Sequence, residues 1–181
     1  MGHIISKDGV KIDPERIEAI AKIPLPPTKK ALKSFFGKIN FVRRFIPNFA
    51  EVAKSLNKQL KNDVKFQWDE QGKKAFKEIK DVISKAPILV SLDYCKEFQI
   101  LSFASEDTIV GVLLQKNDQG QEQPIAYMSK VLQDVEVRHH ILEKQANALI
   151  RSHKHFITFV GYSKVIGYVH SATIKEVLSQ T

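Results

Sequence analysis

The stretch that decides the fold runs from Phe98 to Ser129 and reads FQILSFASEDTIVGVLLQKNDQGQEQPIAYMS. Three of its segments, 98–103, 108–115 and 123–129, are rich in apolar and β-branched residues, which is typical of strands. The run Asn117-Asp118-Gln119-Gly120 separates the second segment from the third and favours a turn. The sequence therefore predicts a three-stranded meander in the second half of the chain.

A helical segment and a fourth strand are expected after this meander. Residues 136–160 contain neither Gly nor Pro, and their apolar residues predict one long helix that ends at Gly161. Residues 164–169 favour a fourth strand, and residues 172–178 favour a short final helix. The second half is thus predicted to be a β-β-β-α-β-α unit that starts near Pro87.

The chain opens with the pattern of a β-hairpin. Apolar residues on both sides of Lys7-Asp8-Gly9 predict two short strands, and Asp-Gly is a favoured turn dipeptide.

The segment that follows, up to about residue 85, has the periodicity of helices. Asp13, Thr28 and Asp69 are good N-caps for three of them, and Pro47 is expected to end the second. A further helix is expected over about 48–61. The fold class predicted for the whole chain is therefore α+β, with a hairpin and a helical segment before the sheet.

Positive charge is concentrated at one end of the chain. The 28 Lys and Arg residues exceed the 20 Asp and Glu residues, so the formal net charge is +8. Residues 1–62 hold 13 basic and 5 acidic side chains (+8), 63–90 hold 6 and 5 (+1), and 91–181 hold 9 and 10 (−1). Such a segment suits contact with a nucleic-acid backbone. The alternative is that these charges only solvate the outer faces of helices.

Composition limits the classes of protein that fit. A hydrophobic fraction of 43% supports a folded core. Every apolar run is far shorter than the roughly 20 residues needed to span a bilayer. The N-terminus lacks the pattern of a secretory signal. We therefore expect an intracellular protein, cytoplasmic or nuclear, that is not secreted and has no membrane partner.

Motifs in both halves resemble one family. In the first half these are Gly2-His3-Ile4-Ile5-Ser6, Pro14-Glu15-Arg16-Ile17, Leu32-Lys33-Ser34-Phe35-Phe36-Gly37, Asn40-Phe41-Val42-Arg43-Arg44-Phe45-Ile46 and Phe66-Gln67-Trp68. In the second half they are Phe103-Ala104-Ser105, Gly111-Val112-Leu113-Leu114-Gln115, Pro124-Ile125-Ala126-Tyr127 and Glu143-Lys144-Gln145. Together they resemble the Pol polyprotein of gypsy-type LTR retrotransposons.

The resemblance implies a domain organisation and partners. Residues 1–12 would be a primer-grip-like hairpin that remains from the palm, and 13–87 a helical thumb or connection. Residues 88–181 would be a degenerate and truncated ribonuclease H-like domain. The implied partners are an RNA:DNA hybrid or template-primer duplex, and the palm and fingers of the polyprotein that this chain lacks.

The chain departs from the family where metals are bound. The family uses Mg²⁺ or Mn²⁺ held by carboxylates, but no Asp-Asp pair of the polymerase motif occurs in this sequence. The three matched carboxylate positions of the ribonuclease H are occupied by Phe103, Gln145 and His170. No catalytic residue, metal site or cofactor is therefore expected. His139 and His153 would lie ~21 Å apart on one helix, too far to share an ion.

The function predicted from these residues is non-catalytic binding of a nucleic-acid backbone. The residues expected to make the contacts are Lys29, Lys30, Lys33, Lys38, Arg43 and Arg44. One alternative is an active ribonuclease H that uses relocated acids, namely Glu106, Asp107 or Glu143. Another is a relic without function, or a module that packs on the palm.

Overall fold

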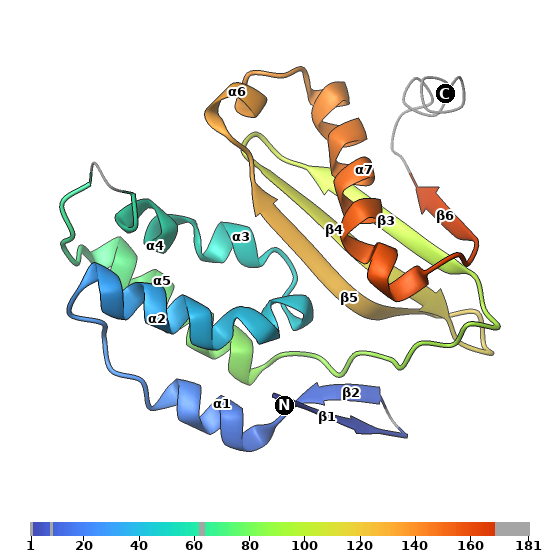
Figure 1. Ribbon diagram of the computed structural model, residues 1–181, viewed down its shortest axis with the longest axis horizontal. Helices are drawn as coiled ribbons and strands as arrows, with labels where there is room; N and C mark the ends of the chain where they lie inside the picture. Colours follow the sequence, from blue (N-terminus) through green and yellow to red (C-terminus); the bar gives the residue numbers. More distant parts are fainter. Residues whose placement is uncertain (1, 8, 62–63, 169–181) are drawn as a thin grey trace.

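The computed structural model describes residues 2–7, 9–61 and 64–168. Figure 1 shows an α+β architecture with three parts: a small N-terminal hairpin, a group of helices, and a four-stranded mixed sheet with one long helix across a face. The group of helices lies beside the sheet, along its β5 edge (Figure 1). The predicted fold class is confirmed.

The hairpin is formed by β1 (His3–Ser6) and β2 (Gly9–Ile12), which pair antiparallel as predicted. Gly9 has a φ of 127°, a backbone conformation that residues other than glycine rarely adopt. The hairpin is tied to the segment before the sheet. The Val10 N–H donates to the Leu89 carbonyl (2.6 Å), and the Leu89 N–H donates to the Val10 carbonyl (2.9 Å).

Two of the helices begin as the sequence predicts. The Asp13 side chain accepts the Glu15 N–H at the start of α1 (Pro14–Ala21). The Thr28 hydroxyl accepts the Ala31 N–H at the start of α2 (Lys29–Ile39).

The expected end of the second helix at Pro47 is wrong, because the α-helix stops at Ile39. A 3₁₀-helix, η1 (Asn40–Phe45), takes its place. In a 3₁₀-helix, residues three apart lie on the same side. Val42 and Phe45 are therefore both fully buried in the core of the helical segment.

The helix expected over 48–61 is in fact two short ones, α3 (Phe49–Val52) and α4 (Lys54–Gln59). They are separated by Ala53, which is fully buried. The next helix, α5 (Glu70–Ser84), is capped by Asp69 as predicted, with its carboxylate 2.7 Å from the Gly72 N–H.

The predicted meander is confirmed as β3 (Phe98–Ala104), β4 (Thr108–Lys116) and β5 (Glu122–Val131). The fourth strand, β6 (Val165–Tyr168), pairs parallel with β3, so the strand order is β5-β4-β3-β6. The last helix expected over 172–178 lies outside the described residues.

The single helix expected over 136–160 is wrong, because a break at His139 and His140 divides it. A short α6 (Asp134–Val137) comes first, and α7 (Ile141–Val160) follows. His140 is extended and acts as the N-cap of α7, since its Nδ1 accepts the Leu142 N–H at 3.3 Å. His139 therefore precedes the helix that carries His153. Gly161 ends α7 as predicted.

Close packing of α7 on the sheet depends on Gly111 in β4. A Cβ on this glycine would lie 2.1 Å from the Ser152 Oγ and 2.8 Å from its Cβ. Ser152 is fully buried, and its hydroxyl has no hydrogen-bond partner among the described residues. The helix thus sits directly on the backbone of the strand.

We expect Gly111→Ala to lower the free energy of unfolding by about 1–3 kcal/mol in urea denaturation, because the added methyl overpacks this contact. Ser152→Gly should relieve part of that loss in the double variant, since the two sites are coupled. Gly37→Ala is the control, because its Cβ would meet no atom within 4 Å. Equal losses at Gly111 and Gly37 would contradict this account.

Candidate nucleic-acid interface

The group of helices and the sheet meet along β5. The Ala50 N–H donates to the Ser129 Oγ at 2.8 Å, and the ammonium of Lys54 pairs with the Asp107 carboxylate. Tyr127 of β5 packs against the core of the helices. We call this contact the seam. It places η1 alongside β5, with α7 nearby.

The lysines of α2 lie on the side of the helix that faces away from its core. Leu32, Phe35 and Ile39 are buried, whereas Lys30, Lys33 and Lys38 are exposed. Lys29 differs, because its Nζ donates to the Lys61 carbonyl at 2.6 Å. Three of the four lysines are therefore exposed, and the fourth holds the chain after α4.

Arg43 and Arg44 of η1 stack on aromatic rings. The Arg43 guanidinium lies 5.1 Å from the centre of the Phe49 ring. The Arg44 guanidinium lies 5.0 Å from the Phe45 ring and 6.0 Å from that of Phe159. Burial lowers the pKa of both arginines from its ordinary value, yet arginine stays charged in proteins. The stacking restricts where these two charges can lie.

These arginines line a groove at the seam, which we call the junction groove. Its volume is about 730 Å³, and its walls come from η1, β5 and α7. The basic residues that line it are Arg43, Arg44, Lys130, Arg151, Lys154 and His155. None of the described residues that line it is acidic. The groove is therefore positively charged.

Two histidines near the arginines of η1 have lowered pKa values. Partial burial, and then the charge of Arg43, lower the pKa of His155. Desolvation, and then the charge of Arg44, lower the pKa of His3. Burial first, and then repulsion from these arginines, thus lowers the pKa of both imidazoles and favours their neutral form.

Sequence reasoning missed Lys130, Arg151 and Lys154. They belong to residues 91–181, whose net charge is −1. Adding up the charges of that whole segment therefore gives no sign of a local basic cluster. The neutralising carboxylates lie elsewhere, apart from Glu136, which pairs with Arg151. Only the fold brings these three side chains opposite Arg43 and Arg44.

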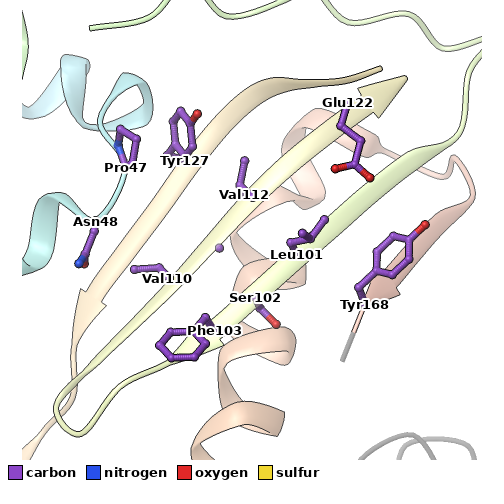
Figure 2. A pocket seen from close by; sticks show the side chains of 11 residues that line it. Pro47, Asn48, Leu101, Ser102, Phe103, Val110, Val112, Glu122, Tyr127 and Tyr168 are labelled. Atoms are coloured by element: carbon purple, nitrogen blue, oxygen red, sulfur yellow. The ribbon is translucent and has the colours of Figure 1, made fainter. Parts of the chain in front are cut away.

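Phe103, at the first matched carboxylate position, lies on the face of the sheet that is turned away from α7. With Leu101, Val110 and Val112 it lines an apolar pocket of about 540 Å³ (Figure 2). Phe103 is 48% exposed. A phenyl ring offers no ligand to a hard cation such as Mg²⁺.

Gln145, at the second matched position, binds the backbone of the same strand end. Its Oε1 accepts the Ala104 N–H and its Nε2 donates to the Ala104 carbonyl, both at 3.3 Å. The structure thus brings the positions of Phe103 and Gln145 together around Ala104. The third position, His170, lies outside the described residues.

Within the part of the chain that the structure describes, the relocated acids are not gathered into an alternative metal site. Asp107 is paired with Lys54, and the Glu143 carboxylate is 65% exposed and 3.9 Å from the His139 imidazole. Across the described residues, we find no cluster of three or more His, Cys, Asp or Glu side chains placed to hold a metal ion. These side chains do not fit the two-metal centre that the family resemblance implies.

No helix among the described residues is long and apolar enough to cross a membrane.

We expect Gln145→Glu to destabilise the fold at pH 8 by about 1–3 kcal/mol, since a carboxylate cannot donate to the Ala104 carbonyl. Facing that carbonyl should raise the pKa of the introduced carboxyl above its unfolded value. The folded state then binds a proton more tightly, so the loss should shrink as the pH falls from 8 toward 4. Urea denaturation of the wild type and of Gln145→Glu across this pH range measures the difference in their free energies of unfolding. A loss that grows on acidification would contradict the assigned hydrogen bonds.

Comparison with known proteins supports a reverse-transcriptase origin. A family model described as an RNase H-like domain found in reverse transcriptase matches residues 68–166. The Pol polyprotein from transposon opus of Drosophila melanogaster is 32% identical over 163 residues, which cover 84% of this chain and 16% of that protein. The Tf2-3 polyprotein of Schizosaccharomyces pombe is 30% identical over 156 residues, which cover 86% of this chain and 12% of that protein. The chain thus spans less than a fifth of the length of these relatives.

Solved structures show the same fold. The foamy viral protease-reverse transcriptase in complex with dsDNA matches 100% of this chain and 38% of its own, with a TM-score of 0.83 and 26% identity. The same enzyme in complex with RNA/DNA hybrid matches 96% of this chain and 24% of its own, with a TM-score of 0.82 and 28% identity. The gypsy type stays a prediction. The chain belongs to the RNase H-like domain family of reverse transcriptases, and its relatives are retrotransposon Pol polyproteins.

Proposed function

We propose that this chain is a non-catalytic part of a retrotransposon reverse transcriptase that holds a template-primer duplex by its phosphate backbone, in a thumb and connection role. The observation that carries the proposal is the stacking of Arg43 and Arg44 on aromatic rings in a groove whose described lining includes no carboxylate. Lys30, Lys33 and Lys38 extend the positive surface along α2. Lys29 contributes indirectly, because its ammonium donates to the Lys61 carbonyl and so holds the chain after α4 in place.

The relatives support the ligand class. The foamy viral protease-reverse transcriptase has been solved in complex with dsDNA and with RNA/DNA hybrid, at more than 25% identity to this chain. A protein that holds such a duplex needs positively charged Lys and Arg side chains that contact phosphates, and it does not need to recognise individual bases. The exposed lysines and the stacked arginines meet that requirement.

The absence of catalysis is proposed from the chemistry of the matched positions. Two-metal hydrolysis needs several carboxylates around the cations. Phe103 faces an apolar pocket, and the Gln145 amide is occupied by Ala104. The palm and fingers of the polyprotein are the proposed protein partners.

A second candidate function is that of an interaction module that packs on other parts of the polyprotein. The apolar pocket around Phe103, Leu101 and Tyr168 is the observation that favours it. Failure of the chain to bind any nucleic acid would favour this candidate over the first.

We expect binding to an RNA/DNA hybrid, measured by fluorescence anisotropy, to weaken steeply between 50 and 300 mM salt. Arg43→Ala/Arg44→Ala should lower the affinity and make the slope of log K against log salt shallower by roughly two, because two phosphate contacts are lost. Lys77→Ala/Lys85→Ala removes the same charge from exposed sites on and just after α5 and serves as the control. Salt-independent binding would contradict the proposal.

We expect no cleavage when the purified chain is incubated with a labelled RNA/DNA hybrid and Mg²⁺ or Mn²⁺. Glu143→Gln, prepared in the same way, reports any contaminating nuclease. Cleavage by the wild-type chain that disappears in Glu143→Gln would establish the relocated-acid alternative and refute the proposed loss of catalysis.

A further inference from the structure

The junction groove has a wall that the proposed function does not use. Lys130 of β5 and Lys154 of α7 line it together with the arginines of η1. Both lysines are exposed, and neither forms an ion pair with a described residue. Arg151 lies on the same wall, but Glu136 of α6 pairs with it. Lys130 and Lys154 therefore carry the available charge of this wall.

A second, smaller hollow continues the groove toward α2. Its volume is about 200 Å³, and Lys33, Arg43 and Asn40 are among the residues that line it. Arg43 and Asn40 also line the junction groove, so the two hollows adjoin at η1. None of the described residues that line the smaller hollow is acidic. A continuous basic track thus runs from α2 across η1 to β5 and α7.

We propose that this track holds one phosphodiester strand across the seam, with Lys130 and Lys154 of the RNase H-like half as direct phosphate contacts. The inference rests on the proposed function and adds that the near-neutral half of the chain supplies part of the grip. The first matched carboxylate position takes no part in it, because Phe103 lines the apolar pocket on the other face of the sheet.

Charge complementarity selects the occupant. A phosphodiester strand carries evenly spaced negative charges along its length, and basic grooves that track it are usual in proteins that hold nucleic acid. The aromatic residues Tyr127 and Phe159 also line the groove. They suit a sugar-phosphate backbone with its apolar sugar faces. An acidic peptide is the competing occupant, and the experiment separates the two.

The test compares Lys130→Ala/Lys154→Ala with Lys77→Ala/Lys85→Ala in the full chain, using anisotropy of a labelled RNA/DNA hybrid at several salt concentrations. We expect about a tenfold or greater loss of affinity at 50 mM salt and a slope shallower by roughly two. The control should bind as the wild type does. Lys130→Arg/Lys154→Arg should restore both affinity and slope, which a merely structural defect would not explain.

Three results would overturn the inference. If Arg43→Ala/Arg44→Ala weakens binding while Lys130→Ala/Lys154→Ala leaves both affinity and slope unchanged, the proposed function stands and this inference fails. If the wild-type chain does not bind the hybrid, both fail. If labelled poly-glutamate at equal charge concentration binds the wild type more tightly than the hybrid does, and only its binding is lost in Lys130→Ala/Lys154→Ala, the groove selects an acidic peptide. Thermal unfolding of each variant verifies that it is folded.

Discussion

The seam between the helices and β5 is the contact on which the charged surface depends. The Ala50 N–H and the Ser129 Oγ are 79 positions apart in sequence, and their hydrogen bond fixes α3 against the strand. The pair formed by Lys54 and Asp107 holds the same junction from the next helix. Because η1 immediately precedes α3, Arg43 and Arg44 are held next to Lys130 and Lys154. Neither half of the chain forms this groove alone.

The RNase H-like sheet keeps its architecture with a phenyl ring and an amide at two of the positions where the family resemblance implies carboxylates. Two carboxylates close together without a metal would repel each other and raise their pKa values. At the matched positions the Phe103 ring lies in an apolar pocket and the Gln145 amide satisfies both backbone groups of Ala104. The sheet carries β5 and α7, which both contribute residues to the junction groove.

Local signals were sufficient to predict most of the fold. Asp13, Thr28 and Asp69 cap helices as predicted, because capping depends on only a few neighbouring residues. The sequence does not predict the end of α2 at Ile39, since buried Val42 and Phe45 favour η1 through tertiary packing. It does not predict the break at His140 either, because residues 136–160 contain no Gly or Pro. The basic helical segment was also predictable from its charge. The contribution of Lys130 and Lys154 was not, because a sum over a segment ignores which residues the fold brings together.

Limited acetylation of lysines, read by mass spectrometry with and without an RNA/DNA hybrid at low salt, tests the central claim most directly. The claim is that the nucleic acid lies in the track across the seam. Lys33, Lys130 and Lys154 should be protected by the hybrid, while Lys77 of α5 and Lys85 just after it should react as they do in the free chain. Equal protection of all five lysines, or none at Lys130 and Lys154, would contradict the account.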